Sequence, residues 1–160
     1  MKLENMEESA LNVNYALLTS QIVLTLEDLI QGKEITKKKQ VLLTEGEKLL
    51  SKIVEGAAFV ERKESLKGIS PTLQGLSIYG YALSTIDILN LLREKDGFTE
   101  FFLELYTDIQ ELKEKKKDRD SVERLKNFFF VLGNLLRVDI QKQSYPKETL
   151  PFIPKNDRLH

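Results

Sequence analysis

The sequence predicts an all-α protein: an up-and-down bundle of four to five antiparallel helices, followed by an extended tail. Apolar residues recur at steps of three or four along most of the 160 residues, and almost no segment shows the alternation of a half-buried strand. Glycines and prolines separate the periodic segments at short intervals, and short connections make consecutive helices antiparallel. We expect the bundle over residues 1–142 and the tail over residues 143–160.

Two long helices are expected in the first part of the chain. The first should run from about residue 7 to residue 31, because Gly32 stands where a left-handed C-cap is typical. The second should run from about residue 36 to residue 64. Thr44 and Glu47 have capping-box spacing, which would allow this helix to begin again at Thr44.

The third helix has the clearest start signal in the sequence. Ser70 is a good N-cap, and Pro71 suits the first helical position, where a missing N–H costs nothing. The helix should run almost to Gly97, which would end it. Few charges interrupt the segment, so we expect it to be the central helix, with Gly75 and Gly80 allowing a neighbouring helix to approach closely.

Two further helices are expected in the second half of the chain. The fourth should span residues 98–117, and the fifth should begin at Asp120, which has capping-box spacing with Glu123, and end near Lys142. The fifth helix carries two adjacent apolar stripes, so two neighbours are needed to cover it. Phe130 lies off both stripes, and we expect it under the tail or between two copies of the chain.

Composition excludes several classes of function. A net charge of −1 and a pI near 6.0 give no overall attraction to nucleic acid or to anionic membranes. The absence of cysteine excludes thiol nucleophiles, disulfides and thiolate metal sites. The uncharged stretches 9–26 and 68–86 hold too many polar residues to span a bilayer, and the acidic start of the chain is unlike a secretory signal. We therefore expect a cytoplasmic protein with no membrane partner.

The sequence offers little for catalysis. The one histidine is His160, the last residue, which argues against Ser–His pairs, histidine-ligated metals and haem. No glycine-rich phosphate loop is present. We expect no cofactor and no enzymatic activity. The alternative is a metal-dependent hydrolase that uses Glu100, Glu104 and Asp108 on one face of the fourth helix, but a solvated acidic face is favoured because no second acidic helix is evident.

Two lysine clusters suggest a second alternative, a sequence-independent nucleic-acid-associated subunit of a ribonucleoprotein. Clustered lysines contact phosphates, but acidic neighbours dilute both clusters and no aromatic residues alternate with them to stack on bases. Solvated helix ends are therefore the favoured interpretation. The candidate phosphate contacts are Lys37, Lys38, Lys39, Lys115, Lys116 and Lys117.

Exposed aromatic and apolar residues near the C-terminus form the candidate interaction surface. Prolines divide the tail, so it should be extended and could dock on its own bundle or on a partner. The candidate residues are Phe130, Tyr145, Leu150, Phe152 and Ile153. A further alternative is an apolar-ligand sensor without haem, with a cavity near Tyr79 and Phe129.

The favoured function is that of a non-enzymatic helical protein-interaction module. It would be an adaptor, a small subunit of a larger assembly or a homodimeric scaffold. The charge-free sections of the first and third helices and the wide apolar face of the fifth exceed what a small bundle usually covers, so we expect self-association.

Overall fold

The computed structural model describes residues 3–62, 71–90, 96–116 and 118–144, with side chains described from Val13 to Lys142 within those ranges. No strand occurs in these ranges, and the expected all-α helical bundle is confirmed. The five helices are α1 (Leu3–Ile30), α2 (Lys37–Glu61), α3 (Leu73–Leu89), α4 (Phe98–Lys113) and α5 (Arg119–Ser144).

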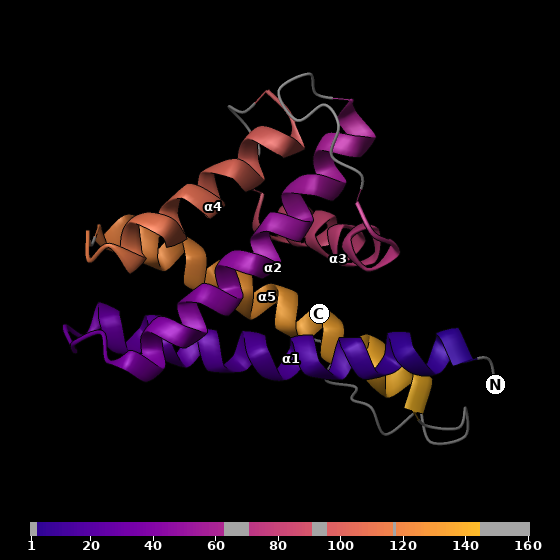
Figure 1. Ribbon diagram of the computed structural model, residues 1–160, viewed down its shortest axis with the longest axis horizontal. Helices are drawn as coiled ribbons and strands as arrows, with labels where there is room; N and C mark the ends of the chain where they lie inside the picture. The colour runs from indigo at the N-terminus through magenta and orange to yellow at the C-terminus, as the bar shows by residue number, and fades with distance from the viewer. Residues whose placement is uncertain (1–2, 63–70, 91–95, 117, 145–160) are drawn as a thin grey trace.

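The first and last helices of the chain lie side by side along the length of the molecule (Figure 1). Lys126 of α5 contacts Glu27 near the end of α1, whereas Arg137, further along α5, contacts Ser20. The contacts run in opposite order along the two helices, so α1 and α5 are antiparallel.

A second antiparallel pair, α2 and α4, crosses the first (Figure 1). Gln40 at the start of α2 donates to the carbonyl of Lys113 at the end of α4, over 2.8 Å. At the other end of the pair, Glu61 of α2 contacts Thr99 of α4. Helix α3 packs against α2 and α5.

The ends of α2 and α3 follow from local capping, which differs from the sequence-based expectation at two positions. Helix α2 is continuous, so it does not begin again at Thr44; it is capped by Thr36, whose hydroxyl accepts the N–H of Lys39 at 3.3 Å. The N-cap of α3 is Thr72, which accepts the N–H of Gly75 at 2.9 Å, rather than the predicted Ser70, which lies outside the described residues. Ser70 and Thr72 are both good N-caps, and Pro71 after Ser70 favoured the wrong one in the sequence.

Gly97 begins a helix instead of ending one. Helix α3 ends at Leu89, where Asn90 adopts a left-handed conformation with φ of 55°. Gly97, with φ of 130°, precedes α4, and the carboxylate of Glu61 accepts the backbone N–H groups of Phe98 at 2.7 Å and Thr99 at 3.0 Å. The α4 start is thus capped by the last residue of α2, a contact that no local sequence pattern reports.

The junction between α4 and α5 also differs slightly from expectation. Helix α4 ends at Lys113, and Lys115 adopts a left-handed conformation with φ of 65°. The carboxylate of Asp118 accepts the N–H of Ser121 at 3.3 Å and its hydroxyl at 2.9 Å, so Asp118 caps α5 instead of Asp120.

A chain of phenylalanine rings forms the centre of the core. Phe102 has edge-to-face contacts with Phe101, Phe128 and Tyr79, and Phe128 has one with Phe129, at centroid distances of 5.3 to 6.2 Å. All four phenylalanines are fully buried. Helix α5 contacts α1, α3 and α4, so more than one neighbour covers its apolar face, as expected. The residues buried along one of its two apolar stripes are Val122, Leu125, Phe129, Leu132 and Leu136.

Helix α3 is peripheral, contrary to the expectation that it is central. One side is buried, but Gly80 and Ile88 are exposed, and a Cβ at Gly80 would meet no atom within 4 Å. The exposed positions of α3 are Leu73, Gly80, Ser84, Asp87 and Ile88, and only Asp87 among them is charged. Of the two glycines expected to allow close approach, only Gly75 lies against a neighbouring helix: a Cβ at Gly56 of α2 would be 3.2 Å from the carbonyl oxygen of Gly75.

None of the described helices combines the length and the apolar character that crossing a membrane requires.

Candidate interaction site

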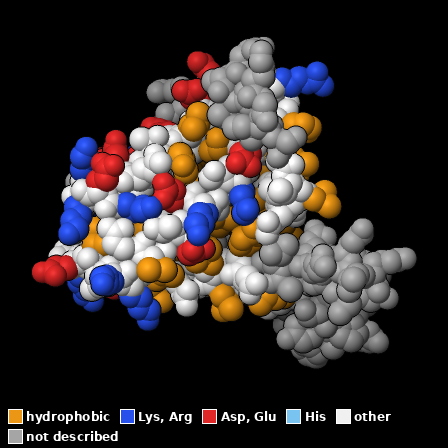
Figure 2. All heavy atoms as spheres, in the orientation of Figure 1, with side chains coloured by type: hydrophobic (Ala, Val, Ile, Leu, Met, Phe, Trp, Pro, Cys, Tyr) orange, Lys and Arg blue, Asp and Glu red, His pale blue; other side chains and the backbone are white. Residues whose placement is uncertain are grey.

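Of the ten large apolar side chains that are exposed among the described residues, five lie on the outer surface of the α1–α5 pair and five on α2 and α3. Leu24 is 67% exposed, Leu17 61% and Phe130 52%, and Val13 and Val138 are also exposed. Figure 2 shows hydrophobic side chains along the lower edge of the molecule, over α1. Isolated exposed apolar residues are normal in soluble proteins, so such residues indicate an interaction surface only where they lie next to one another.

These residues share one side of the helix pair. Val13, Leu17 and Leu24 are separated by four and seven positions, which places them on one side of α1, and the eight positions between Phe130 and Val138 do the same on α5. Leu24 and Phe130 line one groove of about 260 Å³ between the helices. By the antiparallel register, Leu17 is level with Val138. The exposed apolar residues therefore form one surface.

No exposed residue of this surface carries a charge, although charged residues make up 31% of the chain. Besides the apolar residues, its exposed positions are all Asn or Gln. We call this surface the uncharged face. From residues 13–26 of α1 and 127–141 of α5 its exposed members are Val13, Asn14, Leu17, Gln21, Leu24, Asn127, Phe130, Asn134, Val138 and Gln141.

The two helices beneath the uncharged face are held in close contact. A Cβ at Gly133 would lie 2.6 Å from the hydroxyl oxygen of Thr19, so only glycine fits without a shift. The Thr19 side chain is fully buried, and its hydroxyl donates to the carbonyl of Ala16 at 2.8 Å. The uncharged face thus lies on two helices, α1 and α5, that pack tightly against each other.

Arg137 is the one charged residue that lines the groove, and it is partly buried. Its guanidinium donates to the hydroxyl of Ser20 at 2.8 Å and to the side-chain oxygen of Asn134 at 2.7 Å. Among the described residues it has no carboxylate partner. These two bonds hold the guanidinium of Arg137 between α1 and α5. The exposed positions around it are occupied by uncharged residues.

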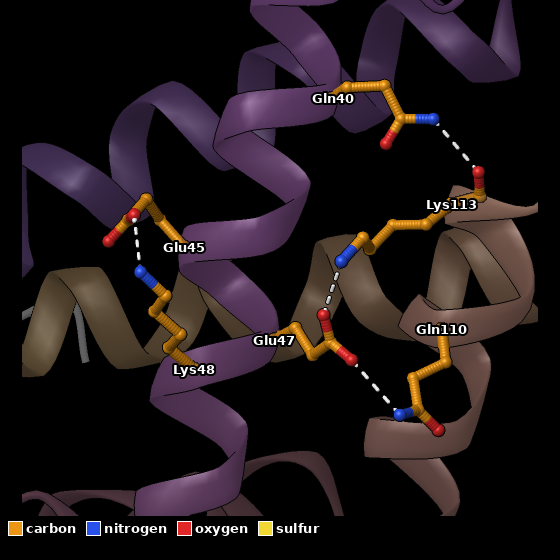
Figure 3. A network of polar contacts seen from close by, with 6 residues as sticks. All are labelled: Gln40, Glu45, Glu47, Lys48, Gln110 and Lys113. Carbon is orange, nitrogen blue, oxygen red and sulfur yellow. Dashed lines mark hydrogen bonds and ion pairs between the residues drawn. The ribbon is translucent and has the colours of Figure 1, made fainter.

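A polar network joins α2 to α4 and fixes the second helix pair (Figure 3). The carboxylate of Glu47 accepts a charged hydrogen bond from Lys113 and a second bond, of 3.0 Å, from the side-chain amide of Gln110. The bond from Lys113 is the main cause that lowers the pKa of Glu47; burial opposes it, and Gln110 and the charge of Lys113 add to the lowering. Because these partners lie on another helix, the network is structural.

The Glu47 network makes stability depend on pH. A lowered pKa in the folded state stabilises the fold above the pKa of an unfolded glutamate, about 4.3, and this contribution is lost as the pH falls through the folded value. We expect Glu47→Gln to lower the free energy of unfolding by about 1 kcal/mol at pH 7. The difference from the original chain should shrink below about pH 4.

Urea titrations of both chains at pH 7 and pH 3.5 measure this difference. Glu45→Gln is the matched control, since Glu45 has only an exposed bond with Lys48, of 3.3 Å, within the same helix. An effect of Glu47→Gln that is equal at both pH values would contradict the assignment.

The predicted carboxylate row does not converge with other metal-binding side chains. Asp108 is buried and accepts two bonds from Arg124 of α5, at 2.9 and 3.3 Å. The pKa of Asp108 is raised: burial is the largest cause, Arg124 opposes it, and the charges of Glu104 and Glu111 add to the rise. Glu100 is exposed on the same helix, and Glu104 is partly exposed. Within the described ranges no three acidic or histidine side chains gather around a common point.

The fold brings the two lysine clusters to the same end of the molecule. The Gln40–Lys113 bond places the first turn of α2 beside the last turn of α4. Acidic residues are interspersed there: Lys39 pairs with Asp28 at 3.5 Å, and Lys116 pairs with Glu114 at 3.6 Å. Figure 2 shows both signs of charge at this end. Lys37, Lys38 and Lys115 are exposed, and Lys117 lies outside the described residues.

The other predicted site residues separate into two groups. Phe130 is exposed on the uncharged face, whereas Tyr145, Leu150, Phe152 and Ile153 lie outside the described residues. Tyr79 packs on Phe102, whereas Phe129 borders the groove beside Phe130.

The lack of charge over residues 9–26 of the first helix was part of the reason to expect self-association, but no residue of that helix was named for the surface. A second apolar spacing, through Val13, Leu17 and Leu24, was the available signal. No pattern in the sequence indicated how α1 and α5 align with each other.

Comparisons of the chain with protein-family models, with curated proteins and with solved structures give no match.

Proposed function

We propose that this protein is a helical interaction module that self-associates through the uncharged face. The observation that supports the proposal is the concentration of exposed apolar and amide side chains, without charge, on one surface of the α1–α5 pair. Interface centres are depleted of charge and rich in aromatic and apolar residues, and a continuous exposed patch of this kind is uncommon on monomers.

A second copy of the chain is the partner that suits this face best. Helices α1 and α5 are 28 and 26 residues long, and a two-fold axis across their outer surface would bring four antiparallel helices together. Each copy would offer the same surface, whose exposed positions carry no charge, while the partly buried guanidinium of Arg137 is bonded to Ser20 and Asn134. The amide side chains of Asn134 and Gln21 would hydrogen-bond across the interface or to trapped water.

Charge introduced on the uncharged face should prevent association. In the double variant Leu24→Glu/Phe130→Glu, four carboxylates would be buried near one another in a symmetric dimer, so we expect the dissociation constant to rise by at least about 100-fold. Sedimentation velocity over a range of micromolar concentrations measures this change, and circular dichroism verifies that the helices remain.

The matched control is Phe59→Glu, because Phe59 is 55% exposed and lies on α2, away from the uncharged face. This variant should associate like the original chain. Equal weakening by the control and by the double variant, or a monomeric original chain throughout the concentration range, would refute self-association through this surface.

A further inference from the structure

Arg137 lines the groove between α1 and α5 with a guanidinium that is fixed in position but not neutralised. Its Nη1 atom donates to the hydroxyl of Ser20 at 2.8 Å, and its Nη2 atom donates to the side-chain oxygen of Asn134 at 2.7 Å. Nη1 also lies 3.5 Å from the place that a Cβ of Gly133 would take, so the guanidinium lies close to the backbone of α5. Both hydrogen-bond partners are uncharged. The charge of Arg137 therefore has no counter-charge within the described part of the chain.

An anion in the groove can reach this charge. Arg137 is partly exposed, and a guanidinium has more N–H groups than the bonds to Ser20 and Asn134 use. The hydroxyl of Ser20 accepts one of these bonds, which leaves its own hydrogen available to an anion. Parallel N–H groups of a planar guanidinium match the two oxygens of a carboxylate. The polar part of the groove therefore suits a carboxylate.

The remaining wall of the groove is mainly apolar. The volume of about 260 Å³ is close to the lower limit of ligand pockets, about 300 Å³. The hydroxyl of Thr19, which also lines the groove, already donates to the carbonyl of Ala16. A cationic group beside an apolar wall is complementary to a molecule that has both a carboxylate and an apolar chain. The apolar lining residues are Val23, Leu24, Phe129 and Phe130.

Self-association would bury Arg137 without a counter-charge from the second copy. The exposed positions of the uncharged face hold no acidic residue, so the opposing copy supplies no carboxylate. On the same two helices, Glu27 pairs with Lys126, and Asp139 accepts the hydroxyl of Tyr81 of α3. A charge that is removed from water without a partner of opposite sign costs free energy. An anion bound in the groove would remove this cost.

We propose that this groove binds a free alkyl carboxylate. The carboxylate of the ligand accepts N–H groups of Arg137 and the hydroxyl of Ser20, while its alkyl chain packs against Val23, Leu24 and Phe130. The acidic side chains of proteins have too few methylene groups to cover such a wall, which favours a free carboxylic acid over a protein segment. Binding neutralises Arg137, so the ligand also tightens the dimer; this second effect rests on the proposed function.

Octanoate is the probe, titrated into the full chain by calorimetry, with NMR of the Arg137 side-chain N–H signal to locate the site. We expect saturable binding and a saturable shift of that signal. Octanamide lacks the charge and acetate lacks the chain, so each should bind at least about tenfold more weakly. Arg137→Gln should weaken octanoate binding by at least about tenfold, and Arg137→Lys, which keeps the charge but not the planar group, should weaken it less. The matched control is Arg119→Gln, the same change at an exposed position of α5, which should bind octanoate like the original chain.

Sedimentation velocity with and without octanoate gives a second readout. Octanoate should lower the dissociation constant of the dimer by at least about tenfold for the original chain and for Arg119→Gln, but not for Arg137→Gln. Without octanoate, Arg137→Gln should associate at least as tightly as the original chain, whereas a purely structural role of Arg137 would weaken association. Absence of saturable octanoate binding, or equal binding of octanamide, would overturn the proposal even if the chain forms dimers. Saturable binding by a chain that stays monomeric would support the carboxylate site and refute self-association.

Discussion

Phe102→Ala should lower the free energy of unfolding by about 3–5 kcal/mol. Phe102 is fully buried, and its ring has edge-to-face contacts with Phe101, Phe128 and Tyr79, so one substitution removes contacts that join α3, α4 and α5. The loss includes the transfer energy of the ring and the cavity that remains, because tightly packed neighbours close such a space only in part. Urea denaturation followed by circular dichroism measures it.

The matched control is Phe59→Ala, which removes the same ring from a position that is 55% exposed. Its effect should be within about 0.5 kcal/mol. A similarly small loss for Phe102→Ala would show that the phenylalanine chain is not the centre of the core.

Gly56→Ala should destabilise the chain by about 2 kcal/mol, although alanine favours helices more than glycine does. The new Cβ would lie 2.8 Å from the Cβ of Tyr79 and 3.2 Å from the backbone carbonyl oxygen of Gly75. Neither atom is at the end of a flexible side chain, so α2 and α3 must move apart. Thermal and urea denaturation of the purified variant measure the loss.

Gly80→Ala should have the opposite effect on stability from Gly56→Ala. Gly80 lies in the middle of α3 with nothing within 4 Å of the new Cβ, so the substitution should stabilise the chain by about 1 kcal/mol. If both glycine substitutions had the same sign, close approach at Gly56 would not be the reason for its effect.

The helices were predictable because each buries one stripe whose spacing is visible in the sequence. The ends were less predictable where the stabilising group comes from elsewhere in the chain. Glu61 caps α4 from 37 residues away, so Gly97 was assigned to the wrong helix. The position of α3 was also mistaken, since a lack of charge does not distinguish a buried helix surface from a neutral exposed one. Gly80 and Ile88 lie on a neutral exposed surface of α3.

The candidate interaction site was predictable only in part. Phe130 was identified because it lies off both apolar stripes of α5. Its association with Leu24, and that of Val138 with Leu17, depends on how α1 and α5 align, which is fixed by contacts such as Gly133 with Thr19 across more than 100 residues.

A spin label at Asn134 tests the central claim, association through the uncharged face, most directly. The chain has no cysteine, so Asn134→Cys provides a single attachment site at an exposed position of α5. Electron–electron dipolar spectroscopy then detects only distances between copies. We predict a defined short distance for this label and a longer or unresolved one for Gly80→Cys on α3. Absence of coupling between copies at Asn134, or a shorter distance from Gly80→Cys, would contradict the account.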